Sequence, residues 1–149
     1  MMPLRRFTIH QPKTINEASQ MLAEFGNKGR LYAGGTELLL AMKHDLLRYE
    51  HLVDVKTIPD LDKIETQNGA LMIGSTATHR AIERSATVRQ SLPVLADMET
   101  HVANVRVRAS GTWAETSALP SRTPIPQHCW QRWAPRHICK PNRGTERWA

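Results

Sequence analysis

The feature that most constrains this chain is a regular alternation of short apolar runs and amphipathic helical segments over its first third. The apolar runs lie at Phe7–Ile9, Leu31–Ala33 and His51–Val55, and each pair of runs is separated by a segment with helical spacing. Strands that alternate with helices in this way favour βαβ units with parallel strand pairing. We therefore expect a small βαβ unit over residues 1–56.

The two helices of that unit have recognisable ends and faces. Thr14 and Glu17 form a capping box, and Gly26 is typical of a helix C-terminus. The expected apolar faces consist of Ile15, Ala18, Met21, Leu22 and Phe25 in the first helix, and of Leu38, Leu39, Met42 and Leu46 in the second.

A different pattern follows Pro59-Asp60. Asn68-Gly69 supplies the two positive φ angles of a tight hairpin between runs at 63–65 and 70–73. A short helix is expected after Thr78, and one long helix from Pro93 whose face carries Leu95, Met98, Val102 and Val105. The whole body is thus expected to be α+β, with an incomplete antiparallel-sheet α+β unit over residues 57–112.

The composition changes at Trp113. All four tryptophans, both cysteines and five of the nine prolines lie in residues 113–149. This segment has six Lys/Arg and two Asp/Glu, so it supplies +4 of the formal charge of +6 and leaves the body nearly balanced. Because it shows no period of 2 or 3.6, we expect it to be a disordered tail. Two cysteines are too few for a disulfide scaffold.

The most informative local motif is Ala33-Gly34-Gly35-Thr36-Glu37-Leu38, between an expected strand and an expected helix. Glycines there allow a tight turn and leave no Cβ in the way of a ligand, while successive N–H groups favour an anion such as pyrophosphate. The motif matches neither common nucleotide-binding fingerprint. A plain strand-to-helix turn is the alternative interpretation.

Two further segments could contribute to a site. Small hydroxylic residues at Ile73–His79 could hydrogen-bond a ribityl or phosphate group, or else form only a Thr78 helix cap with His79 at the surface. The arginines of Arg106–Thr112 could pair with phosphate, or form a solvated basic turn.

Taken in order, these motifs resemble the FAD-binding domain of the molybdopterin dehydrogenases, over residues 7–112. The matching segments are 7–18, 33–38, 52–55, 58–61, 73–79, and 107–108 with 111–112. The resemblance implies a fold of the FAD-binding PCMH type, related to vanillyl-alcohol oxidase and the carbon monoxide dehydrogenase flavoprotein. It assigns cofactor binding to Leu31, Tyr32, Ala33, Gly34, Gly35, Thr36, Glu37, Leu38, Gly74, Thr78, His79, Gly111 and Thr112, and it assigns no catalytic or metal-binding residue.

The chain departs from the family at its second flavin loop. There the family has Gly-Thr-(Ile/Leu)-Gly-Gly-Asn, whereas Trp113-Ala114-Glu115 follows Gly111-Thr112 here, and Ala109 replaces a usual asparagine. Codons for Trp113 to Thr116 read one nucleotide earlier permit Leu-Gly-Gly-Asn. We therefore hypothesise a one-nucleotide frameshift near codon 113, which the second reading frame of the gene tests.

The resemblance also implies a function. Members accept electrons in FAD from 2Fe-2S clusters on a small subunit, which are reduced through a molybdopterin cofactor on a large subunit. The chain is accordingly expected to be part of an FAD-dependent oxidoreductase complex. No apolar run at the N-terminus is long enough for a signal peptide or membrane span, so we expect a cytoplasmic location.

Other functions remain open. The chain could be a non-enzymatic fragment that only docks on partner subunits. Alternatively, tail arginines interleaved with Trp130, Trp133 and Trp148 could engage nucleic acid. A zinc site from His128, Cys129, His137 and Cys139 lacks paired close ligand spacing and is disfavoured.

Overall fold

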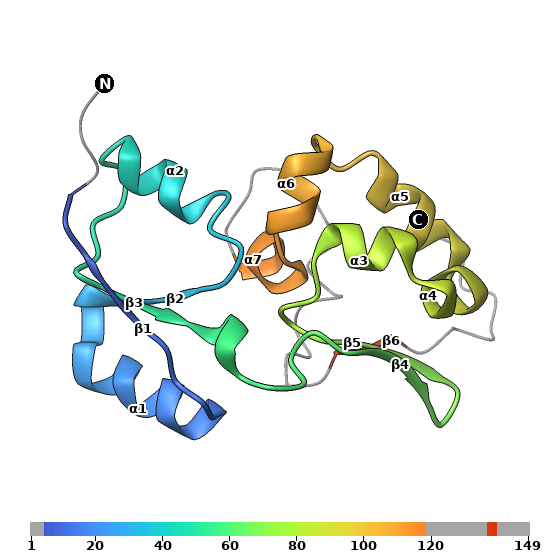
Figure 1. Cartoon of the computed structure of the whole chain (residues 1–149), viewed down its shortest axis with the longest axis horizontal. Helices are drawn as coiled ribbons and strands as arrows, with labels where there is room; N and C mark the ends of the chain where they lie inside the picture. The colour runs from blue at the N-terminus through green and yellow to red at the C-terminus, as the bar shows by residue number, and fades with distance from the viewer. Residues whose placement is uncertain (1–4, 119–136, 140–149) are drawn as a thin grey trace, which may run out of the picture.

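The computed structural model describes residues 5–118 and 137–139, which form two units that each contain a small sheet (Figure 1). The first unit has a parallel three-stranded sheet, and the second has an antiparallel sheet with helices packed beside it. This mixed architecture of α-helices and β-strands agrees with the expected class at that level.

The first sheet places its last strand in the centre. It consists of β1 (Thr8–His10), β2 (Gly29–Tyr32) and β3 (His51–Asp54), in the order β1-β3-β2. Both pairings are parallel, with Ile9 opposite Leu52 and Leu31 opposite Val53. The predicted parallel pairing of the first unit is therefore confirmed.

Helices cover both faces of this sheet. Neighbouring residues of a strand point to opposite faces, and Leu52 packs with Leu38 and Met42 of α2 (Leu38–Lys43), whereas Val53 packs with Ala18 of α1 (Ile15–Phe25). Figure 1 shows the two helices on either side of the sheet. The unit therefore has two thin apolar layers rather than one thick core.

The ends of α1 follow the predicted capping pattern. The Thr14 hydroxyl accepts from the Glu17 N–H at 3.1 Å, and the Glu17 carboxylate accepts from the Lys13 N–H at 2.7 Å. Gly26, with φ of 52°, ends the helix before a short 3-10 turn, Gly26–Lys28. The other helix is shorter than expected, because Asp45 has a positive φ of 58° and Leu46 lies beyond the helix and is exposed.

The second sheet is a hairpin with a third strand added. It consists of β4 (Ile64–Gln67), β5 (Ala70–Ile73) and β6 (His137–Cys139), all antiparallel. Asn68 and Gly69 have φ of 52° and 74°, as the predicted tight turn requires. A 3-10 turn, Val55–Thr57, leads from the first unit toward this hairpin.

Five short helices complete the second unit. They are α3 (His79–Arg84), α4 (Ala86–Ser91), α5 (Pro93–Thr100), α6 (Val105–Ser110) and α7 (Trp113–Ala118). The expected long helix from Pro93 is wrong: the chain turns at Ala103, with φ of 42°, and the Asn104 side chain caps a new helix. Neither α4 nor α7 was predicted from the sequence.

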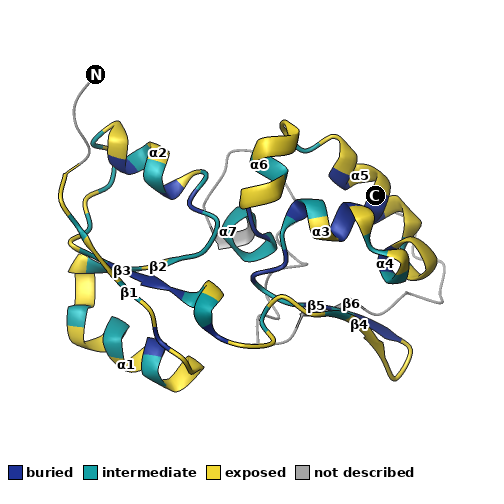
Figure 2. Ribbon diagram, viewed as in Figure 1, coloured by how far each residue is buried: buried dark blue, intermediate teal, exposed yellow. Residues whose placement is uncertain are grey.

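The core of the second unit lies between its sheet and its helices (Figure 2). Its members are Leu71, Ile73, Ala77, Ile82, Val88, Leu95 and Ala96, and Ile64, Leu92 and Trp113 pack against them. No helix in residues 5–118 has the length and apolar character needed to cross a membrane. Trp130, Trp133, His128 and Cys129, on which the alternative tail functions depend, lie outside the described residues.

Candidate functional site

The fold brings together three segments that are far apart in the sequence. Gly111 lies between the glycine loop and the start of α3, because a Cβ added to it would be 3.3 Å from both Thr36 Oγ1 and His79 Cδ2. The Gly111 carbonyl accepts from the His79 N–H at 3.2 Å, and Thr78 pairs with Thr112 in an isolated bridge. Residues 33–38, 78–79 and 111–112 therefore meet where the two units touch.

Each glycine of the loop has a physical reason to be glycine. A Cβ on Gly34 would collide with the Ser110 carbonyl oxygen and would lie 2.7 Å from Gly111 Cα. Gly35 has φ of 74° and lies beside the Tyr32 ring. The loop is thus held against the end of α6 by close backbone contact.

An acidic side chain from α7 reaches into this loop. The backbone N–H groups of Glu37, Leu38 and Gly35 lie near the carboxyl group of Glu115 and favour its charged form. Its Oε2 atom is buried beside Gly34 and has no partner of its own. The glycine loop therefore faces a carboxyl group that belongs to the protein itself.

The environment of Glu115 disfavours its charged form. Burial is the largest influence and raises the pKa of this carboxyl, while the three backbone N–H groups lower it. The nearby Glu37 carboxylate raises it further, and the net pKa lies above the ordinary value. The loop consequently compensates only part of the cost of burying this charge.

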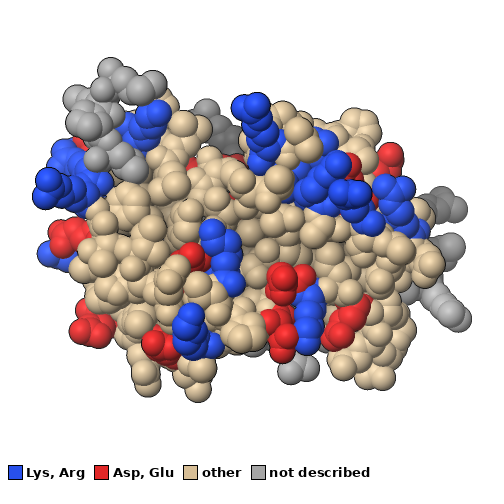
Figure 3. Space-filling view, in the orientation of Figure 1, with Lys and Arg blue, Asp and Glu red and all other residues tan. Residues whose placement is uncertain are grey.

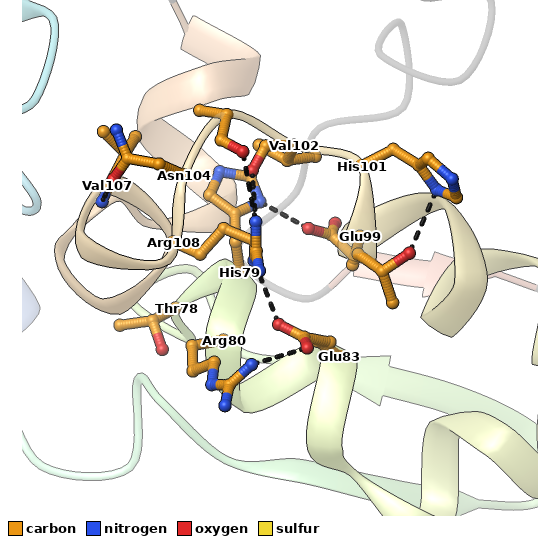
Figure 4. A network of polar contacts seen from close by, with 12 residues as sticks. Thr78, His79, Arg80, Glu83, Glu99, His101, Val102, Asn104, Val107 and Arg108 are labelled. Carbon is orange, nitrogen blue, oxygen red and sulfur yellow. Dashed lines mark hydrogen bonds and ion pairs between the residues drawn. The ribbon is translucent and has the colours of Figure 1, made fainter.

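His79 is buried and uses both ring nitrogens. Nδ1 lies 2.7 Å from Glu99 Oε2, and Nε2 lies 2.8 Å from Thr116 Oγ1. A neutral imidazole has one donor and one acceptor nitrogen, so the tautomer in which Nδ1 donates to Glu99 accepts the Thr116 hydroxyl at Nε2. Figure 4 shows His79 and Glu99 facing each other. The surface placement considered for His79 is wrong, and its ring instead joins α3, α5 and α7.

The arginines before Gly111 serve different purposes. Arg108 Nε donates to Glu83 at 3.0 Å, and its Nη1 donates to the Val102 carbonyl at 2.9 Å, as Figure 4 shows. Hydrogen bonds from Arg80 and then Arg108 hold the pKa of Glu83 below its ordinary value, against the opposing effect of burial. Arg108 is therefore engaged in the structure, whereas Arg106 is exposed.

Some of the predicted site residues face elsewhere. Leu31 is 49% exposed on β2. Lys56 Nζ lies 4.7 Å from the centroid of the Tyr32 ring. The same ring lies beside Gly35. Gly74 packs on the backbone of Leu61 and Lys63, and its N–H donates to the Lys63 carbonyl at 2.7 Å. A close backbone contact within the second unit thus explains the glycine at position 74.

Two important residues escaped the sequence analysis. Glu99 is fully buried, and its position four residues after the apolar Leu95 on α5 was the available signal. Glu115 had a clearer signal, because an acidic residue stands where a glycine was expected next to an anion loop. Glu115 was passed over because its helix was missed, whereas Glu99 lies on a predicted helix and was passed over because its partner His79 is distant in the sequence.

Outside the glycine loop, the described surface carries mixed charges and an open hollow. On the face in Figure 3, basic side chains form separate groups with acidic ones between them. An open hollow lined by Arg5, Arg6, Phe7, Thr8, Glu50 and His51 lies at the start of β1 and β3, away from the loop. Among the side chains that the structure describes, in residues 5–116, no group of three or more His, Cys, Asp or Glu is arranged to hold a metal ion.

The donors of the glycine loop suit a phosphate-type anion, but the arrangement does not admit one. The N–H groups that would bind it are taken by Glu115, and the space beside Gly34 is filled by Ser110 and Gly111. Thr112 Oγ1 is buried without a partner close by. An external pyrophosphate therefore fits this site only if Glu115 moves out.

Comparison with known proteins gives the family. The family model described as "FAD binding domain in molybdopterin dehydrogenase" matches residues 5–114. The carbon monoxide dehydrogenase medium chain of Hydrogenophaga pseudoflava is 36% identical over 107 residues, which are 72% of this chain and 37% of that protein. A putative xanthine dehydrogenase FAD-binding subunit of Escherichia coli is 30% identical over 105 residues, 70% of this chain and 36% of that one.

Solved structures give the same result. Carbon monoxide dehydrogenase from Hydrogenophaga pseudoflava matches with a TM-score of 0.74 and 34% identity, covering 76% of this chain and 40% of that one. Quinoline 2-oxidoreductase from Pseudomonas putida 86 matches with a TM-score of 0.75 and 31% identity, covering 78% and 41%. The chain spans just over a third of the length of the curated relatives. It belongs to the family of FAD-binding domains of the molybdopterin dehydrogenases.

Proposed function

We propose that this chain is part of an FAD-binding electron-transfer subunit of a molybdenum hydroxylase. The glycine loop 33–38 is the element that binds the pyrophosphate of FAD, with Thr36, Gly111 and Thr112 beside it. When bound, FAD supplies the isoalloxazine that accepts and releases electrons, and the protein holds it and shapes its surroundings. The fold assigned to this role is the PCMH-type fold of flavoproteins.

One observation carries the proposal. Backbone N–H groups of Gly35, Glu37 and Leu38 are oriented toward one carboxyl group and favour its charged form, although burial outweighs them. Oriented backbone donors of this kind are what a phosphate group requires. The loop also lies within the residues that the family model matches.

The partners follow from the same assignment. A small subunit with 2Fe-2S clusters delivers electrons to the flavin, and a large subunit with the molybdopterin cofactor oxidises the substrate. The relatives include a medium chain and FAD-binding subunits, names that describe members of multi-subunit enzymes. We assign the complex to the cytoplasm.

The second candidate is a non-enzymatic fragment that only docks on those partner subunits. The occupation of the loop by Glu115 favours it, because an internal carboxylate takes the donors that the cofactor needs. The two candidates differ in whether the loop accepts FAD at all.

Fluorescence titration distinguishes them. We expect the purified chain to quench FAD fluorescence in a saturable manner with one site per chain, and to leave the fluorescence of riboflavin, which has no pyrophosphate, unchanged. FAD retained after desalting should keep its visible absorption bands. Equal responses to FAD and riboflavin, or no response to FAD by the chain and by its Glu115→Gln variant, would overturn the flavin assignment and leave the docking fragment.

A further inference from the structure

The contact between Glu115 and the glycine loop goes beyond the family assignment. No other segment supplies a charged side chain to this loop among the contacts of the described residues. Glu115 comes from α7, whereas its donors lie nearly eighty positions earlier in the chain. The contact therefore closes the junction between the two units.

Backbone bonds hold the start of α7 in place. The Trp113 N–H donates to the Ala77 carbonyl at 2.9 Å, and the Ala114 N–H donates to the Ser75 carbonyl at 3.0 Å. Immediately after Glu115, the Thr116 hydroxyl bonds to His79 Nε2 at 2.8 Å, and Glu99 holds the other side of that ring. The backbone on both sides of Glu115 is thus fixed, and the carboxyl group can leave the loop only by rotation of its own side chain.

The carboxylate also occupies the space that a ligand would need. Its Oε2 atom lies so close to Gly34 that an added Cβ would collide with it, and the Ser110 carbonyl oxygen and Gly111 Cα lie similarly close on that side. A pyrophosphate at the same donors would meet these atoms and would also be repelled by the negative charge. Steric exclusion and like-charge repulsion act in the same direction.

We propose that Glu115 is an internal substitute for the pyrophosphate and competes with FAD for the backbone donors of residues 33–38. The reference to FAD rests on the proposed function, whereas the competition itself is a property of the loop and of any phosphate-type anion. Binding of such an anion requires Glu115 to be displaced, so the chain has a lower affinity than the loop alone would provide.

The energetics of Glu115 agree with a removable occupant. Burial of its charge is only partly offset by the three N–H groups, and Oε2 has no partner. A buried charge that is incompletely hydrogen-bonded is unfavourable. Replacing Glu115 by a neutral residue should therefore leave the chain folded.

The test uses the whole chain with inorganic pyrophosphate and FAD as probes. Glu115→Gln keeps the size and removes the charge, Glu115→Gly also removes the side chain, and Glu24→Gln on α1 is the charge-matched control. Backbone amide NMR of Gly35, Glu37 and Leu38 is the readout. We expect the shifts of these amides to give a dissociation constant for pyrophosphate at least tenfold lower in Glu115→Gly than in the unmodified chain or Glu24→Gln. Glu115→Gln should give an intermediate value.

The outcomes separate this proposal from the proposed function. Equal pyrophosphate affinity in all four proteins, or no binding by either Glu115 variant, would overturn the competition. If both Glu115 variants bind pyrophosphate at these amides but not FAD, the competition stands and the flavin assignment fails. If FAD binds equally well to the unmodified chain and to Glu115→Gly, the flavin assignment stands and the competition fails.

Discussion

The two units bury different kinds of side chain. Among the described residues of the first unit, Asp54 is the only buried polar or charged one. Apolar residues on both faces of β3 provide the packing. The second unit buries five polar or charged residues, which are Thr76, His79, Glu83, Glu99 and Thr112. The first unit therefore depends on apolar packing, whereas the second also depends on matched polar partners.

The candidate site lies where these two kinds of construction meet. The first unit contributes backbone donors on the glycine loop, and the second contributes a carboxylate on a helix held by its polar network. A substitution in the first unit should therefore affect the site through the apolar packing that supports the glycine loop. A substitution in the second unit should affect it through the polar network that holds α7.

The largest expected effect comes from apolar packing in the first unit. Leu52 is 0% exposed in the centre of β3, so Leu52→Ala should lower the free energy of unfolding by about 3–4 kcal/mol. Urea denaturation followed by circular dichroism measures this loss. Leu40→Ala is the control, since Leu40 is 54% exposed on α2 and should change stability by less than about 0.5 kcal/mol. A loss below that of Leu40→Ala would contradict the packing model.

A smaller loss is expected from the polar network of the second unit. Glu99→Ala removes the acceptor of His79 and leaves a buried ring nitrogen without a partner, which should cost about 2–3 kcal/mol. Glu99→Gln should recover more than half of that loss, because its amide oxygen still accepts from Nδ1. If the two variants are equally unstable, lost packing rather than the hydrogen bond accounts for the effect.

The sequence predicted best what depends on local pattern. The capping box at Thr14, the hairpin at Asn68-Gly69 and the parallel first sheet follow from residue spacing alone, and the structure confirms them. The break at Ala103 was missed because a residue that is not glycine takes a positive φ there. Helical periodicity runs on through such a position, so one helix was predicted where there are two.

The site was harder to predict because its determinants are non-local. The glycine motif could be recognised, but its occupant comes from a segment judged to be a disordered tail. His79 was predicted either to bind the cofactor or to lie at the surface beside a helix cap, and neither interpretation anticipated its contacts with Glu99 and Thr116. Tertiary contacts between distant residues, rather than propensity, decide both.

A third prediction compares two glycines that are required for different reasons. Gly34→Ala would push a Cβ against the Ser110 carbonyl and Gly111 and should cost about 2 kcal/mol. Gly69→Ala meets no atom within 4 Å but adopts φ of 74°, so it should cost about 1 kcal/mol through backbone strain. Amide shifts at Glu37 and Glu115 should appear only for Gly34→Ala. Shifts of equal size in both variants would mean that the loop is not in contact with the second unit.

The smallest expected effect is the contribution of Glu115, at the contact between the two units, to the pH dependence of stability. Its folded-state pKa is raised, chiefly by burial, so the native state binds this proton more tightly than the unfolded chain does. The resulting stability is fully present below the ordinary carboxyl pKa of 4.5 and is lost as the pH rises through the raised value. Glu83 acts in the opposite direction, because its lowered pKa gives stability that is lost as the pH falls.

The difference between the unmodified chain and Glu115→Gln isolates the first of these contributions, since both proteins contain Glu83. We expect Glu115→Gln to be more stable at pH 7 by less than about 1 kcal/mol, because Glu115 as a whole is only half-buried and the nearby N–H groups offset part of the cost of burial. The difference should shrink as the pH is lowered toward 4.5, whereas Glu24→Gln should show no such trend. A Glu115→Gln variant that is less stable at pH 7 would mean that the three backbone donors outweigh burial, and that the loop holds its internal anion more firmly than the raised pKa indicates.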